Sequence, residues 1–197
     1  MAFFRVVPNL TIMAPANFKE LEDMLEFAVN LGKPVIIRYP RGGEENSNIR
    51  KEKIVLGKSQ VLEQGEDITI ISIGKTVARS LEVAKEIRKK GKTPEVINAR
   101  FLKPLDRKTI KESIEKTKYV ITMEDGTIVN GLATAIKELI VDEKIKNVKI
   151  QNYAYPDEYI KHGMPEELEK LYNQDSKSII ANIDFKYIES TKKKTNA

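Results

Sequence analysis

The alternation of short apolar runs with helical patterns is the feature that most constrains the fold of this 197-residue chain. Apolar runs of strand length lie at 10–14, 35–39, 68–73, 94–98, 119–123 and 148–153. Most are followed by apolar residues at helical spacing, as after residue 17 and over 76–90. Strands that alternate with helices in this way predict an α/β fold with a doubly wound, mainly parallel sheet.

Local signals set several helix boundaries. Asn17 with Glu20 three residues later predicts a helix start of the capping-box type, and Gly32 predicts the end of that helix. Thr76 is expected to cap the helix over 76–90 through its hydroxyl. Three further helix starts are predicted at Asp106, Pro165 and Asp175.

The polar, glycine-rich stretch from residue 42 predicts a domain boundary, with a linker at 46–53 and a short strand near Ile54. Residues 1–45 contain only strand, helix and strand, which is too little to bury a sheet, so they read as the end of a larger α/β domain. Residues 54–185 then form the doubly wound domain. The lysine-rich segment 186–197 is expected to be a disordered basic tail.

Composition excludes several classes of function. The chain has no cysteine and a single histidine, His162, so disulfides, thiolate chemistry and sites with several histidines are excluded. No apolar run is long enough for a transmembrane helix, and we expect no membrane partner. The net charge of +5 owes +3 to residues 186–197, and Lys and Glu alternate on the helices, so we expect no nucleic-acid partner.

Nucleotide-binding motifs are incomplete. Gly74-Lys75-Thr76 lies between a strand and a helix, but the P-loop also needs a glycine at position 69, where the chain has threonine. The adjacent carboxylates Glu124 and Asp125 follow a strand. Two alternatives are open: a functional role, in Mg²⁺ binding or acid/base chemistry, or an ordinary position in a turn. His162 is either catalytic or a hydrogen-bonded structural residue.

The run Arg-Tyr-Pro-Arg-Gly at 38–42 is the most suggestive motif, because it follows an apolar strand. Ligands of parallel α/β sheets gather beyond the carboxyl ends of strands, and a guanidinium offers a planar fork to phosphate or carboxylate. From residue types alone, an anion site and a surface ion pair remain equal alternatives. Arg38, still within the strand, is expected to pair with a carboxylate, whereas Arg41 is expected to point over the carboxyl end of the sheet.

Four segments together resemble the family of 1-deoxy-D-xylulose-5-phosphate synthases. They are the run Pro-Asn-Leu-Thr-Ile-Met-Ala-Pro at 8–15, the run Ile-Arg-Tyr-Pro-Arg-Gly at 37–42, the run Asn-Ala-Arg-Phe-Leu-Lys-Pro-Leu-Asp at 98–106, and the run Tyr-Pro-Asp-Glu-Tyr-Ile-Lys-His-Gly at 155–163. The resemblance extends from about residue 3 to residue 183. It implies that 1–45 ends a pyrimidine-binding domain and that 54–185 is a transketolase C-terminal domain.

This resemblance implies a thiamine-diphosphate- and Mg²⁺-dependent transferase, which decarboxylates pyruvate and joins the two-carbon unit to D-glyceraldehyde 3-phosphate. It also implies a cytoplasmic homodimer whose product feeds isoprenoid, thiamine and pyridoxal synthesis. The Gly-Asp-Gly motif for the cofactor diphosphate is missing here, so we expect no catalytic, cofactor or metal residue in this chain and an inactive fragment that needs the preceding part of the enzyme.

By the same resemblance, Arg41 contacts the phosphate of glyceraldehyde 3-phosphate. From their positions in the sequence, Arg38, Glu124 and His162 are expected to be structural or interface residues. Of the glycine cluster that the family has after its acidic pair, only Gly131 matches. Two alternatives stay open: a non-catalytic assembly or regulatory domain, and a part of another transketolase-like or 2-oxo-acid dehydrogenase β-subunit-like thiamine enzyme.

Overall fold

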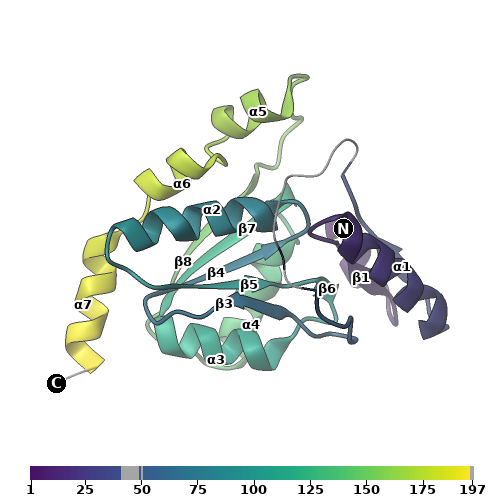
Figure 1. Cartoon of the computed structure of the whole chain (residues 1–197), viewed down its shortest axis with the longest axis horizontal. Coiled ribbons are helices and arrows are strands. Elements are labelled where there is room, and N and C mark those ends of the chain that lie inside the picture. The colour runs from purple at the N-terminus through teal and green to yellow at the C-terminus, as the bar shows by residue number, and fades with distance from the viewer. Residues whose placement is uncertain (41–48, 50, 196–197) are drawn as a thin grey trace.

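The computed structural model describes residues 1–40, 49 and 51–195. Its main sheet has five strands in the order β3-β5-β4-β7-β8, of which only β3 runs antiparallel to its neighbour (Figure 1). The strands are β3 (Gln60–Glu63), β4 (Ile68–Ile73), β5 (Pro94–Asn98), β7 (Tyr119–Thr127) and β8 (Lys149–Tyr155). The expected α/β fold with a mainly parallel sheet is confirmed.

Helices cover both faces of this sheet, as a doubly wound fold requires (Figure 1). The helices are α2 (Thr76–Lys89), α3 (Arg107–Thr117), α4 (Leu132–Asp142), α5 (Pro165–Leu171), α6 (Ser176–Ala181) and α7 (Phe185–Thr195). Strand β4 shows why both faces must be covered. Its residues Ile68 and Ile70 join a buried cluster with α2, α6 and α7, whereas Ile71 and Ile73 join another with α3 and α4.

A second, smaller sheet has the order β2-β1-β6 and lies beside the first. Strands β1 (Thr11–Met13) and β2 (Val35–Ile37) are parallel and joined by α1 (Phe18–Leu31), after the short 3₁₀ helix Ala2–Val6. Strand β6 (Phe101–Lys103) starts three residues after β5 ends, yet it pairs antiparallel with β1. The N-terminal segment therefore shares a sheet with a strand from the other part of the chain.

Several local predictions are confirmed. The Asn17 side chain accepts a hydrogen bond from the amide of Glu20 at 2.8 Å, and Gly32 ends α1 in the left-handed region at φ 62°. Asp106 and Asp175 cap α3 and α6 with their carboxylates, and Pro165 opens α5.

Other local predictions are wrong for identifiable physical reasons. Residues 186–195 are helical rather than a disordered tail, because Ile188 is buried in the cluster beneath α2 and holds α7 in place. Ile54 is buried without forming a strand. Thr76 does not cap α2: its hydroxyl donates to the carbonyls of Ile73 at 3.0 Å and Met123 at 2.9 Å and so ties β4 to β7.

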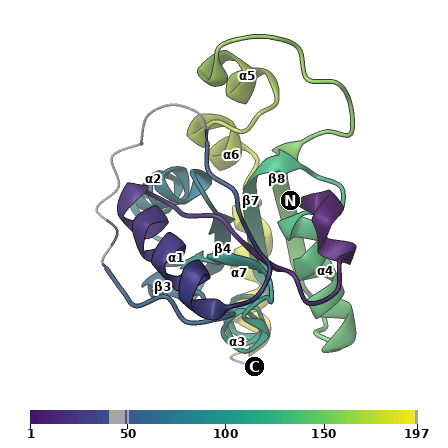
Figure 2. The same cartoon turned by 90° about the vertical axis from the view of Figure 1, so that its right-hand side faces the viewer.

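The two sheets are joined by a buried ion pair between Glu20 of α1 and Arg100 of the β5–β6 turn. The Nε of Arg100 lies 2.7 Å from Oε1 of Glu20, and the two side chains are 3% and 6% exposed. Asn98 donates to the same carboxylate, as does the amide of Ala16 at 2.7 Å, while Arg100 also donates to the side chain of Gln60 at 3.0 Å. Figure 2 shows α1 lying alongside the β3 end of the main sheet.

Removing Glu20 should be costly, because it leaves the charge of Arg100 buried without its carboxylate. We expect Glu20→Ala to lower the free energy of unfolding by about 3–5 kcal/mol. Urea unfolding would measure this, with Glu22→Ala as the control on the same helix. Glu22 is 69% exposed and pairs with Lys19, so its removal should cost about 0–1 kcal/mol. Equal midpoints for the two variants would contradict a structural role for the buried pair.

Candidate functional site

The candidate site lies where the carboxyl ends of β2, β4 and β7 meet. After β4 the chain turns through Gly74 into α2 on one face of the sheet, whereas after β7 it continues into α4 on the other face. Two adjacent parallel strands whose connections leave in opposite directions mark a topological switch point, which is where open α/β sheets place ligands. Arg38, which directly follows β2, reaches this edge from the smaller sheet.

An alternating row of charged side chains crosses this edge, and we call it the ionic chain: Arg38, Asp125, Lys75, Glu169 and Arg79. Oδ2 of Asp125 lies 2.8 Å from Nη2 of Arg38 and 3.6 Å from Nζ of Lys75. Lys75 lies 3.5 Å from Oε1 of Glu169, which also pairs with Nη2 of Arg79 at 2.5 Å. The ionic chain thus links the end of β2 to β7, α2 and α5.

The two ends of the ionic chain differ in burial. The exposed fraction of the side chain falls from 32% at Arg38 to 7% at Arg79, whose Nη1 also donates to the carbonyl of Gln174 at 3.0 Å. Charges withdrawn from water are stabilised only if they are paired and hydrogen-bonded, and here each carboxylate lies between two cations. The row is therefore an ordered structural element rather than a set of mobile surface pairs.

The side chain of Glu124 points to the opposite face of the sheet from that of Asp125 and accepts a hydrogen bond at the start of α4. Its buried carboxylate accepts a hydrogen bond from the amide of Ala133 at 3.1 Å, in the first turn of that helix. Gly131 makes room for it, because a Cβ there would come within 2.2 Å of Oε2 of Glu124. This close approach requires a glycine at position 131 as long as Glu124 keeps its place.

Burial raises the pKa of Glu124 above its usual 4.5, and the amides of Leu132 and Ala133 and the charge of Arg38 offset part of that effect. On the other face of the sheet, burial raises the pKa of Tyr153 to about 12. Both carboxylates of the predicted acidic pair are engaged: Glu124 with the helix amides and Asp125 with two cations.

The structure places the remaining predicted residues as follows. Arg38 pairs with a carboxylate, Asp125, as expected, although it lies just past the end of β2. Arg41 lies outside the described residues. His162 is exposed on the connection between β8 and α5 and is not part of the ionic chain. Its expected role as a hydrogen-bonded structural residue or catalyst stays a prediction.

Sequence reasoning missed three members of the ionic chain: Lys75, Arg79 and Glu169. Lys75 was singled out only as part of an incomplete P-loop motif. Glu169 lies 94 residues further on, in α5, and nothing local marks it as a partner. Lys75 and Arg79 lie one helical turn apart at the start of α2, whereas Glu169 reaches both of them only through the tertiary position of α5.

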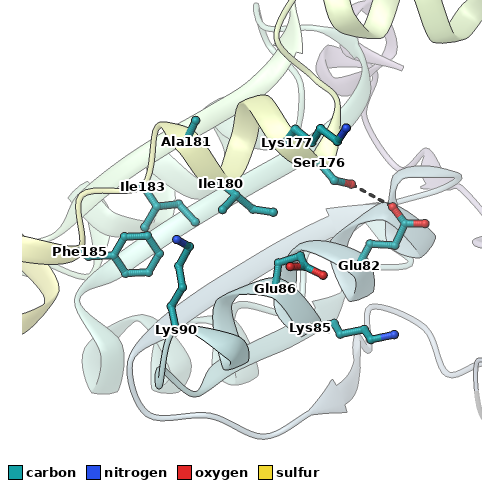
Figure 3. Close-up of a pocket in the computed structure, with 10 residues that line it drawn as sticks. All are labelled: Glu82, Lys85, Glu86, Lys90, Ser176, Lys177, Ile180, Ala181, Ile183 and Phe185. Atoms are coloured by element: carbon teal, nitrogen blue, oxygen red, sulfur yellow. Dashed lines mark hydrogen bonds between the residues drawn. The ribbon is translucent and has the colours of Figure 1, made fainter.

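A groove of about 860 Å³ lies elsewhere, between α2 and the segment containing α6 and the start of α7 (Figure 3). Its apolar wall comes from Ile180, Ile183 and Phe185, and Lys90 lies over the ring of Phe185, 5.5 Å from its centroid. Across the groove, Ser176 donates to Glu82 at 2.9 Å. None of the predicted site residues lines this groove.

Among residues 1–40, 49 and 51–195, no group of three or more His, Asp or Glu side chains is arranged to hold a metal ion. In the same part of the chain, no helix combines the length and the apolar character needed to cross a membrane.

Comparison with known proteins identifies the family. Residues 57–179 match the family described as "Transketolase, C-terminal domain". This chain belongs to that family. The match begins just before β3 and ends within α6, so it contains the whole five-stranded sheet and every member of the ionic chain except Arg38.

Curated relatives extend the similarity to the N-terminal segment. The chain is 40% identical over 190 residues to the 1-deoxy-D-xylulose-5-phosphate synthase of Caldanaerobacter subterraneus, and 38% identical over 190 residues to that of Syntrophomonas wolfei. These alignments cover 96% and 95% of the chain but only 30% of each relative. The chain therefore spans less than a third of the length of the curated relatives it matches.

Solved structures agree on the fold. A structure titled "Split gene transketolase, inactive beta4 tetramer" is similar with a TM-score of 0.84 and 26% identity, covering 96% of this chain and 60% of the other. A transketolase from Campylobacter jejuni has a TM-score of 0.65 at 19% identity, over 91% of this chain and 26% of that one. The second likeness concerns the fold alone.

The raised pKa of Glu124 predicts a pH-dependent contribution to stability. The folded protein holds this proton at a pH where the unfolded chain has released it, so the contribution is fully present below 4.5 and is lost as the pH rises through the folded-state pKa. We expect the stability difference between the wild type and Glu124→Gln to decline from about pH 4.5 upward. Urea unfolding from pH 4 to 8 would measure it, and a difference independent of pH would contradict the shift.

Proposed function

We propose that this chain is the C-terminal part of a 1-deoxy-D-xylulose-5-phosphate synthase and works only together with the rest of that enzyme. The observation that carries the proposal is the 40% identity to a synthase over 96% of the chain. The complete enzyme would decarboxylate pyruvate and join the two-carbon unit to D-glyceraldehyde 3-phosphate, with thiamine diphosphate and Mg²⁺, as a cytoplasmic homodimer.

The cofactor would be held by the part of the enzyme outside this chain. Thiamine diphosphate supplies the carbanion chemistry when bound, and its diphosphate needs a metal held by oxygen ligands. The described residues do not fit that need, because Glu124 and Asp125 already serve helix amides and cations. The proposed contribution of this chain is to bind the acceptor aldehyde at the run 38–42 and to support that run.

A second candidate follows from the resemblance to the split-gene transketolase. That structure has 26% identity and a TM-score of 0.84, which favours a subunit of a transketolase-like enzyme encoded in separate pieces. Substrates distinguish the two: a synthase consumes pyruvate and releases CO₂, whereas a transketolase moves a two-carbon unit between sugar phosphates without releasing CO₂. Assaying the complete enzyme with each substrate pair would decide between them.

The isolated chain should be inactive. We expect no CO₂ release from pyruvate and no heat of binding when thiamine diphosphate and Mg²⁺ are titrated into it. The complete enzyme containing this chain is the positive control and should give both signals. Turnover by the isolated chain above a no-protein control would contradict the proposal that the cofactor site lies elsewhere.

Arg41 should matter for the acceptor only, because glyceraldehyde 3-phosphate has a phosphate and pyruvate does not. In the complete enzyme we expect Arg41→Ala to lower kcat/KM for the aldehyde by roughly ten- to a hundredfold, the loss of a charge-assisted contact of about 1.5–3 kcal/mol. Steady-state kinetics in both substrates would measure this. The matched control is Arg107→Ala, because Arg107 is 45% exposed on α3. This variant should leave kcat/KM unchanged for both substrates. Equal losses for both substrates would make Arg41 structural.

A further inference from the structure

Helix α5 and the connection before it project from the rest of the domain, and we call residues 156–172 the arm. Strand β8 ends at Tyr155, and the chain runs through residues 156–164 before α5 begins at Pro165. Both views show α5 standing away from the main sheet beyond this connection (Figures 1 and 2). None of the seven residues of α5, all of which the structure describes, is buried. The helix of the arm therefore contributes little to the core of the domain.

The arm exposes large apolar side chains. Tyr159 is fully exposed, and Met164 and Leu171 are 65% and 61% exposed. A helix as short as α5 has little stability of its own and is ordinarily held by burying an apolar face. Several exposed apolar residues in one short segment are instead typical of a surface that contacts another protein.

Charges, rather than apolar packing, hold α5 in place. The side chain of Glu169 is only 13% exposed and pairs with Lys75 and Arg79 at the start of α2. At the base of the arm, the rings of Tyr155 and Tyr172 meet edge to face, with centroids 5.5 Å apart. Withdrawing charges from water is costly, so they must be paired, and here their pairing orders the arm without using its apolar side chains. Those side chains are left available to a partner in a fixed place.

The charge of the arm indicates the chemistry of that partner. The whole chain has a net charge of +5, yet the arm contains five carboxylates and only two lysines. Glu169 is balanced by its two cations, and the other carboxylates leave the arm acidic. A complementary surface is therefore apolar with basic side chains around it. A second copy does not fit this description, because a twofold contact through the arm would bring two acidic segments together.

We propose that the arm docks on a basic, apolar surface in the part of the synthase that lies outside this chain, with Tyr159 and Met164 as its anchors. The inference rests on the proposed function, under which this chain is one piece of a longer enzyme. The chain covers only 30% of each of the relatives from Caldanaerobacter and Syntrophomonas, so most of such an enzyme is available to cover the arm. The arm also follows the carboxyl end of β8, at the edge of the sheet that carries the candidate site.

Hydroxyl-radical footprinting of the complete enzyme tests the docking. The oxidation rates of Tyr159 and Met164 are compared with their rates in the urea-unfolded enzyme. Tyr119 and Met123, which are fully buried in β7, are the matched controls for protection. Because the centre of an interface excludes water, we expect Tyr159 and Met164 to be protected about tenfold, approaching the two controls. Rates close to those of the unfolded enzyme would overturn the inference.

A photo-crosslinking side chain identifies what covers the arm. With p-benzoylphenylalanine in place of Tyr159 in the complete enzyme, we expect cross-links to peptides outside residues 1–197. Cross-links to residues 1–197 would show that this chain or a second copy of it covers the arm, and would overturn the inference. The same group in place of Val141, an isolated exposed residue of α4, is the control and should give a much lower yield. Equal yields at the two positions would also overturn the inference.

Activity assays separate this inference from the proposed function. If the complete enzyme consumes pyruvate and glyceraldehyde 3-phosphate while Tyr159 and Met164 oxidise freely, the inference alone is overturned. If the complete enzyme lacks this activity but both residues are protected and position 159 cross-links outside residues 1–197, the proposed function is overturned and the docking of the arm is not.

Discussion

The buried pair between Glu20 and Arg100 is the interaction on which the two sheets depend. A carboxylate and a guanidinium that are each about nineteen-twentieths buried are tolerable only because each has its partner and further hydrogen bonds. The pair also fixes geometry: Arg100 adopts a φ of 55°, which turns the chain from β5 into β6 within two residues. Helix α1, strand β1 and the main sheet are thereby held in one arrangement.

A second, more exposed set of charges repeats this arrangement at the carboxyl edge of the sheets. Asp125 and Glu124 are neighbours in β7, and their side chains point to opposite faces of the sheet because side chains alternate along a strand. One carboxylate joins the ionic chain, and the other serves the first turn of α4 in the space left by Gly131. The switch point between β4 and β7 is therefore occupied by side chains that order the surrounding segments.

The sequence was sufficient wherever structure is decided locally. The apolar run of β4, the cap at Asn17 and the stop at Gly32 depend on residues close by in the sequence, and all three were predictable. Strand β6 was not, because three residues carry no usable periodicity and its partner β1 lies about ninety residues away. Helix α7 was missed because its lysines suggested a solvated tail, although the buried Ile188 anchors it. Arg38 was expected to find a carboxylate, but which one depended on the fold.

The path of β6 has a consequence for where this protein can be divided. The family match begins at residue 57, and a cut there follows a clear boundary in the sequence. The three-dimensional structure does not divide there. A piece that starts at residue 57 would contain β6 but lack β1, the strand with which β6 pairs. Phe101, now fully enclosed, would face water beside an arginine stripped of its carboxylate. A piece trimmed to the family limits would carry a newly exposed sheet edge, whereas one that starts before β1 keeps that edge covered.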